Sequence, residues 1–130
     1  MVRFLSLCDG SINRMKLAVL FQMTFVGMPC VFYGDEKGMT GVLEEEYRHP
    51  MPWDGGDREL YGFFRKAIAM RRTLAPLRRG DFRTCSAHPG TGLLVYERRY
   101  GPETVTVALN ARPAPAALPA SQRSLYWTEG

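Results

Sequence analysis

The protein has 130 residues, of which 45% are hydrophobic and 23% charged, and a formal net charge of +4. These values are typical of a soluble globular protein, and the length alone suggests one domain. The basic residues are scattered as pairs, so no nucleic-acid partner is expected. No apolar run approaches the roughly 20 residues of a membrane-spanning helix, and the start does not read as a signal peptide. We therefore predict no membrane partner and a cytoplasmic location.

The cysteines and histidines suggest neither a disulfide framework nor a metal site. Cys8 and Cys30 stand in apolar contexts and are expected to be small core residues in a reducing compartment. No pair of cysteines has metal-ligand spacing, and His49 and His88 are far apart in the sequence. The expectation is that the protein binds no metal and no cofactor.

The chain begins with a short apolar segment over residues 1–9, closed by a glycine turn signal. A helix is predicted over residues 12–25, with Ser11 as its N-cap. This helix is apolar on most sides, so it should be buried by neighbouring elements. A chain of 130 residues has little material to cover it. Residues 30–34 form a continuous apolar run, which is typical of a buried parallel strand.

A long polar loop is expected over residues 35–56, and loops of that length in compact domains are usually functional or disordered. A second helix is predicted over residues 57–74, capped by Asp57 and ended by Pro76. The order helix, strand, loop, helix is that of an α/β unit.

The pattern changes near residues 75–80, from helical periodicity to short alternating strands. Three strands are predicted, over residues 82–87, 93–99 and 104–110. Turn signals separate them, which indicates an antiparallel meander. One more strand is expected over residues 125–127. Tyr96, Tyr126 and Trp127 are interpreted as core aromatics, with carbohydrate binding as the alternative. The predicted domains are residues 1–75 and 76–130.

Four segments of the chain resemble the α-amylase family of glycoside hydrolases, which share a (β/α)8 barrel. They are RFL at 3–5, GMPCVFYGDE at 27–36, RHPMPWD at 48–54 and LRRGDF at 77–82. In that order they resemble the segment after the family's His-Asp pair, the last barrel strand, the loop after it, and the entry to the C-terminal β-domain. The likeness is greatest to the neopullulanase, maltogenic amylase and cyclomaltodextrinase branch.

The resemblance implies an α/β region followed by an all-β region: the C-terminal portion of a (β/α)8 barrel and an incomplete antiparallel β-sandwich. Helix 12–25 would be the seventh barrel helix, strand 30–34 the eighth strand, and helix 57–74 the eighth helix. Earlier barrel elements would then cover the apolar surface of helix 12–25.

The resemblance also implies retaining hydrolysis of α-glucosidic bonds in maltooligosaccharides, cyclodextrins or pullulan, with an α-glucan oligosaccharide as the expected partner. The family's nucleophile, acid/base and third carboxylate lie on earlier strands, the third directly before Met1 by its spacing to Arg3. This chain is therefore expected to be a C-terminal fragment without catalytic residues. The alternatives are a non-catalytic glucan-binding protein and a vestigial chain that does not fold.

Asp35 and Glu36 are the adjacent carboxylates that first suggest catalysis. Retaining hydrolysis needs two carboxyl groups about 5–5.5 Å apart on either side of one bond. Adjacent side chains on an extended strand point to opposite faces and do not meet that requirement. We predict instead that Asp35 and Glu36 belong to the substrate-binding rim, where they hydrogen-bond the barrel and position their neighbours.

The loop over residues 35–56 would lie on the barrel rim, where ligands bind. Glu44 and Arg48 stand where the branch often has an Asp and an Arg that hold glucose hydroxyls, but residues 44–47 read EEEY where the branch commonly has Asp-Pro-Asp-Cys. The alternative is a solvated acidic loop paired to one arginine.

Trp53 is predicted either to stack on a sugar face or to pack the loop onto helix 57–74. Arg3 either orients the third carboxylate or caps a barrel strand.

Overall fold

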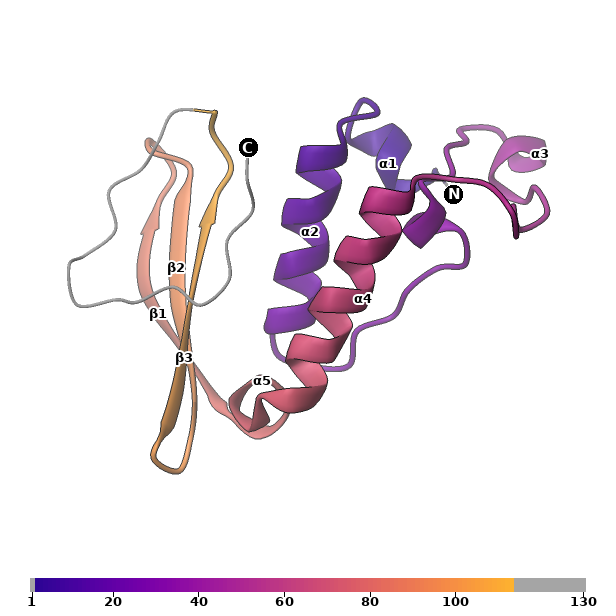
Figure 1. Ribbon diagram of the computed structural model, residues 1–130. Helices are drawn as coiled ribbons and strands as arrows, with labels where there is room; N and C mark the ends of the chain where they lie inside the picture. Colours follow the sequence, from indigo (N-terminus) through magenta and orange to yellow (C-terminus); the bar gives the residue numbers. More distant parts are fainter. Residues whose placement is uncertain (1, 114–130) are drawn as a thin grey trace.

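The computed structural model describes residues 2–113, which form a helical region followed by an antiparallel sheet (Figure 1). The helical elements are α1 (Phe4–Leu7), α2 (Ile12–Thr24), the 3-10 turn η1 (Asp35–Lys37), α3 (Glu44–Tyr47), α4 (Arg58–Thr73) and α5 (Ala75–Arg79). The strands are β1 (Asp81–His88), β2 (Leu93–Tyr100) and β3 (Glu103–Asn110).

The two long helices begin where their capping residues predict. The Ser11 side chain accepts a hydrogen bond from the backbone N–H of Arg14 at 3.4 Å, and the Asp57 carboxylate accepts one from the N–H of Leu60 at 2.8 Å. Each cap satisfies one of the backbone donors that the first turn of a helix leaves unpaired. The predicted starts of both helices are confirmed.

Helices α2 and α4 pack against each other through their apolar faces. The buried side chains between them are Met15, Val19 and Met23 from α2 and Leu60, Phe64 and Ala67 from α4. Fully burying one such large apolar side chain contributes about 1.5–3 kcal/mol. Ile68 of α4 lies outside this core, because 37% of it is exposed.

The sheet has the order β1-β2-β3, and both neighbouring pairs are antiparallel, as the meander pattern predicts. Tyr96, Val107 and Leu109 are buried on one face and form a second core, against which Leu17 and Leu20 of α2 pack. The core interpretation of Tyr96 is confirmed. Helix α2 thus lies between α4 and the sheet, as Figure 1 shows.

Two buried arginines hold the end of α2, one linking it to α4 and the other linking it to the sheet. Arg71 of α4 donates to the carbonyl oxygens of Met23 at 2.7 Å, of Phe25 at 3.1 Å and of Gly27 at 2.5 Å. Arg98 of β2 donates to the carbonyl oxygen of Thr24 at 2.8 Å. These cations satisfy carbonyls that the last turn of a helix leaves without partners, and a positive charge there suits the helix dipole.

The strand predicted over residues 30–34 is wrong for the described chain, where residues 30–32 have no regular structure, residues 33–34 form a turn, and none of them pairs with a strand. A strand requires a neighbour to receive its backbone hydrogen bonds. The carbonyl oxygen of Cys30 instead accepts from the Gln22 side chain at 2.7 Å. Cys30 is exposed, contrary to the core prediction, whereas Cys8 is buried as predicted.

Pro76 differs in role from its prediction. Helix α4 ends at Thr73, and Pro76 then stands in the first turn of α5, where proline is tolerated. The strand predicted over residues 125–127 lies outside the described residues.

Candidate functional site

Residues 35–56 form a folded connection between residues 30–34 and α4. Two short helical elements interrupt it: η1 at its start and α3 in its middle. Gly34 and Gly38 flank η1 with φ of 84° and 75°, a left-handed conformation that glycine adopts without steric cost. The segment therefore has a defined backbone on which side chains can be placed.

Arg3 is the centre of this arrangement, and only 1% of it is exposed. Its Nε donates to the carbonyl oxygen of Tyr47 at 3.0 Å, and its Nη1 donates to the carbonyl oxygen of Tyr33 and to Asp35 Oδ1, the latter at 3.3 Å. The guanidinium lies over the Phe32 ring, 4.3 Å from its centroid. One side chain therefore holds the beginning of the loop and the end of α3 together.

Asp35 and Glu36 lie in a 3-10 turn and differ in their partners. The Asp35 side chain is 15% exposed, and burial raises its pKa, an effect that the hydrogen bond and charge of Arg3 oppose. Glu36 Oε2 is buried and has no hydrogen-bond partner among the described residues. Asp35 is thus hydrogen-bonded by Arg3, whereas Glu36 leaves one oxygen without a partner among the described residues.

Glu44 and Arg48 lie one helical turn apart on α3. Arg48 Nη2 is 3.0 Å from Glu44 Oε1, and the two side chains are 68% and 63% exposed. An exposed pair of this kind contributes only a few tenths of a kcal/mol, about 0.3–0.5. Both groups are therefore available to a ligand at little cost, although the structure equally matches the alternative of an acidic loop paired to one arginine.

Glu46 fixes the start of α3. Its Oε2 accepts from the backbone N–H of Val42 at 2.8 Å and of Leu43 at 3.1 Å. These bonds favour the ionised carboxylate and lower the pKa of Glu46 below its ordinary value.

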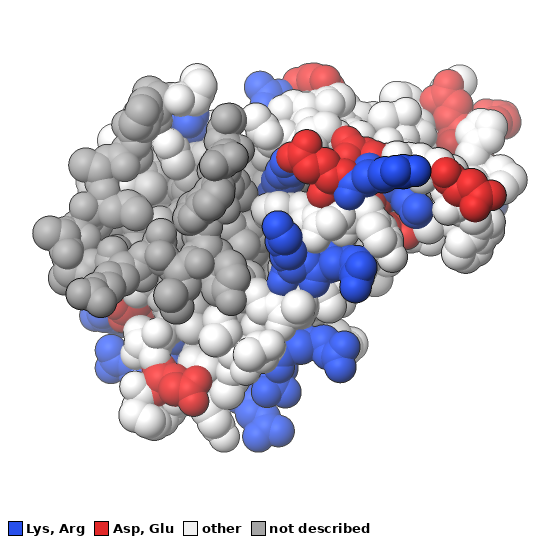
Figure 2. Space-filling view, in the orientation of Figure 1, with Lys and Arg blue, Asp and Glu red and all other residues white. Residues whose placement is uncertain are grey.

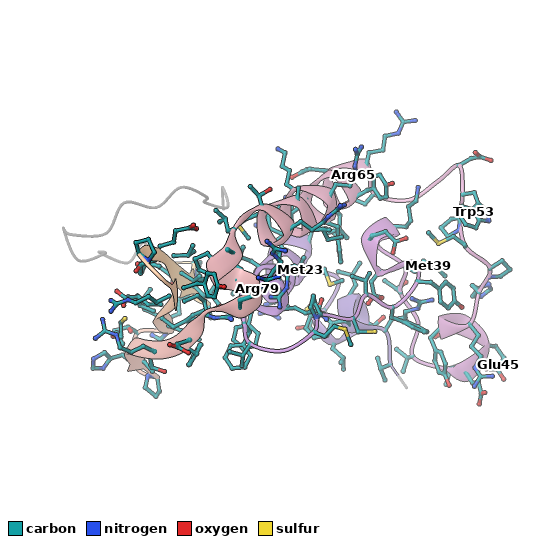
Figure 3. The ribbon with its side chains drawn as sticks, turned by 90° about the horizontal axis from the view of Figure 1, so that it is seen from below. Met23, Met39, Glu45, Trp53, Arg65 and Arg79 are labelled. Atoms are coloured by element: carbon teal, nitrogen blue, oxygen red, sulfur yellow. The ribbon has the colours of Figure 1, made fainter. Side chains whose placement is uncertain are left out.

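Trp53 does not pack onto α4, because 79% of it is exposed, so that alternative prediction is wrong. Its carbonyl oxygen accepts from Lys37 Nζ at 3.4 Å, and the same ammonium lies 4.9 Å from the centroid of the Tyr61 ring. Figure 3 places Trp53 and Glu45 at the same end of the molecule, away from Arg79. The indole is therefore exposed to solvent at the end of the molecule that carries α3.

The sign of the surface charge differs between the two ends of the helical region. Figure 2 shows acidic side chains mainly over the end that carries α3 and the start of α4, and basic side chains mainly toward α5.

Within residues 2–113, no group of three or more His, Cys, Asp and Glu residues could hold a metal ion. In the same residues, no helix has the length and apolar character needed to cross a membrane.

Sequence reasoning missed the importance of Gly41. Its N–H donates to Ser6 Oγ at 2.9 Å, and its carbonyl oxygen accepts from the N–H of Arg3, also at 2.9 Å. A Cβ at this position would lie 2.6 Å from the backbone nitrogen of Tyr47. The one available signal was an arginine within an apolar segment at residues 2–5, but the hydrogen-bond partners of its side chain lie 30 to 44 positions away.

Comparisons with known proteins give one consistent group of enzymes, although no protein-family model matches the sequence. The chain is 41% identical over 119 residues to a cyclomaltodextrinase of Geobacillus thermopakistaniensis (strain MAS1), covering 90% of this chain and 20% of that protein. It is 40% identical over 112 residues to neopullulanase 2 of Thermoactinomyces vulgaris, covering 85% and 19%. A solved cyclomaltodextrinase superposes with a TM-score of 0.78 at 37% identity, covering 84% and 19%. The chain is a relative of the α-amylase-family glycoside hydrolases.

A second solved structure extends the likeness within these α-amylase relatives. The α-amylase of Geobacillus thermoleovorans, in complex with acarbose, superposes with a TM-score of 0.75 at 33% identity, covering 82% of this chain and 24% of that one. The resemblance inferred from the sequence is thereby confirmed. The chain spans about a fifth of the length of the curated relatives that it matches.

Proposed function

We propose that this chain supplies the α-glucan-binding rim of an α-amylase-family glycoside hydrolase, with residues 35–56 as the segment that contacts the sugar. The observation that carries the proposal is the contrast within this segment. Arg3 is buried and fixes the backbone, while the side chains of Glu44, Arg48 and Trp53 remain exposed on it. A fixed backbone with exposed polar and aromatic groups suits a ligand rich in hydroxyls and C–H faces.

The proposed architecture assigns α2 and α4 to the last two barrel helices and the segment 30–34 to the last barrel strand. The sheet β1-β2-β3 would then begin a C-terminal β-sandwich, with the boundary near residue 75. Support comes from apolar side chains left exposed along the segment and its approach, including Val26 at 45%, Met28 at 94% and Val31 at 36%. Neighbouring barrel strands would cover these side chains and give the segment its pairing partners.

The proposed division of roles places bond cleavage outside the described residues. Retaining hydrolysis needs two carboxyl groups on either side of one bond. Asp35 is held by Arg3, and the carboxylate of Glu46 is used to start α3. We therefore assign binding to this chain and catalysis to the larger part of the relatives that it does not match. A non-catalytic glucan-binding protein is the second candidate, favoured by the same exposed groups.

The test is a titration of the 130-residue chain with maltohexaose, followed by calorimetry and by amide chemical shifts. Trp53→Ala is expected to weaken binding about three- to tenfold, the worth of one aromatic contact. Tyr100→Ala removes an exposed aromatic from β2 and serves as the matched control. Absence of binding by the unaltered chain contradicts the proposal.

A second assay separates binding from catalysis. The same chain is incubated with maltohexaose and with β-cyclodextrin, and newly formed reducing ends are counted. We expect none. Reducing ends formed by the chain alone contradict the proposed division of roles, because cleavage would then require carboxylates within this chain.

A further inference from the structure

The contacts of Arg3 go beyond what a simple ion pair requires. Its guanidinium reaches the carbonyl oxygens of Tyr33 and Tyr47 and the carboxylate of Asp35, and its Nη2 lies 3.8 Å from Met39 Sδ. Its own backbone N–H donates to Gly41. The start, middle and end of the connection between residues 33 and 47 therefore all meet at one side chain.

We infer that Arg3 is a positioning residue for glucan binding, which holds α3 in place relative to η1 so that Glu44 and Arg48 present their side chains in one arrangement. This inference rests on the proposed function. Arg3 itself is too buried to touch a ligand, with 1% of it exposed, so its effect passes through the loop backbone.

Two features of the site require an arginine. The guanidinium is planar, carries five donors in a fixed fork, and can serve acceptors on different sides at once, whereas a lysine ammonium is a single point of charge. The plane also lies over two aromatic rings, 4.3 Å from the centroid of Phe32 and 4.7 Å from that of Tyr33. Cation–π contacts of this kind add to the hold on the segment that precedes η1.

Gly41 is the second point of contact and offers an independent perturbation. It accepts from Arg3 and donates to Ser6, and it leaves no room for a Cβ beside Tyr47, which would lie 2.6 Å away. Gly41→Ala should therefore displace α3 from its position beside Gly41, while the charge of Arg3 is unchanged. If position is what matters, this substitution should have the same effect as removing the arginine.

The experiment compares Arg3→Met, Arg3→Lys and Gly41→Ala with the unaltered 130-residue chain. Arg14→Met is the matched control, because Arg14 is an exposed arginine whose ion pair, among the described residues, is with Asp9. Amide hydrogen exchange is measured over residues 39–47 and over α4, and maltohexaose affinity is measured by calorimetry. We expect Arg3→Met to speed exchange in residues 39–47 and to weaken maltohexaose binding, each about tenfold or more, with exchange in α4 unchanged.

Arg3→Lys is expected to give exchange rates and an affinity between those of the unaltered chain and those of Arg3→Met, because lysine keeps the charge beside Asp35 but reaches fewer carbonyl oxygens. Arg3→Lys that equals the unaltered chain, or Arg3→Met that binds as tightly, overturns the inference. If Arg3→Met does not fold, Gly41→Ala decides: weaker binding with α4 intact supports the inference, and unchanged binding overturns it.

The inference and the proposed function fail in different ways. A chain that does not bind maltohexaose contradicts the proposed function, and exchange over residues 39–47 still reports whether Arg3 holds the loop. A chain that binds maltohexaose while Arg3→Met changes neither affinity nor loop exchange contradicts the positioning role alone.

Discussion

The substitution Arg71→Met tests whether the buried arginine at the end of α2 holds that helix end in place. Methionine keeps most of the aliphatic volume but removes the donors to the carbonyl oxygens of Met23, Phe25 and Gly27. Removing a charged donor costs about 1.5–3 kcal/mol for each hydrogen bond whose acceptor then stays buried and without access to water. Only the Met23 bond is fully buried, and water can reach the other two acceptors in part, so we expect a total loss of about 2–4 kcal/mol.

The assay is urea unfolding followed by far-UV circular dichroism. Small domains of this kind are typically stable by about 5–15 kcal/mol, and the urea dependence is about 1–3 kcal/mol per molar, so the midpoint should fall by about 1–3 M. Arg72→Met is the matched control, since Arg72 follows on the same helix with its side chain exposed, and its effect should stay within about 0.5 kcal/mol. Equal midpoints for the two variants would refute the reasoning.

Two further predictions concern pH. Burial raises the pKa of Tyr96, so the folded chain keeps a proton that the unfolded chain releases near pH 10. The free energy of unfolding should therefore fall as pH rises above that value. In Tyr96→Phe the urea midpoint should decrease less steeply with rising pH than in the unaltered chain. The bonds from Val42 and Leu43 lower the pKa of Glu46, so amide protection at the start of α3 should be present at neutral pH and decline as pH drops below the ordinary glutamate range. Glu46→Gln should remove this pH dependence, and Glu45→Gln, which alters an exposed neighbour, should leave it unchanged.

Local signals predicted the elements that depend on nearby residues. The caps at Ser11 and Asp57 fixed where α2 and α4 begin, and the ends of the three predicted strands fall within one residue of those of β1, β2 and β3. In each case the hydrogen bond or periodicity that decides the structure lies within a few positions along the chain.

The failures have the opposite character, because each depends on distant partners. The run at residues 30–34 has strand composition but no neighbouring strand in the described chain. Trp53 has the size and apolarity of a packing residue, yet 79% of it is exposed in the described structure. The contacts of Arg3 with Tyr33 and Tyr47 span 30 and 44 positions, and no pattern in the sequence marks backbone carbonyls as ligands for an arginine.

The central placement of α2 has a consequence for how the chain unfolds. This helix contributes Met15 and Val19 to the core shared with α4, and Leu17 and Leu20 to the core shared with the sheet. If α2 unfolds, each core loses the side chains that α2 contributes and is exposed to solvent on that side. The helical region and the meander should therefore lose their structure in a single cooperative transition, and a cut near residue 75 should yield two pieces, of which the sheet piece does not fold without α2.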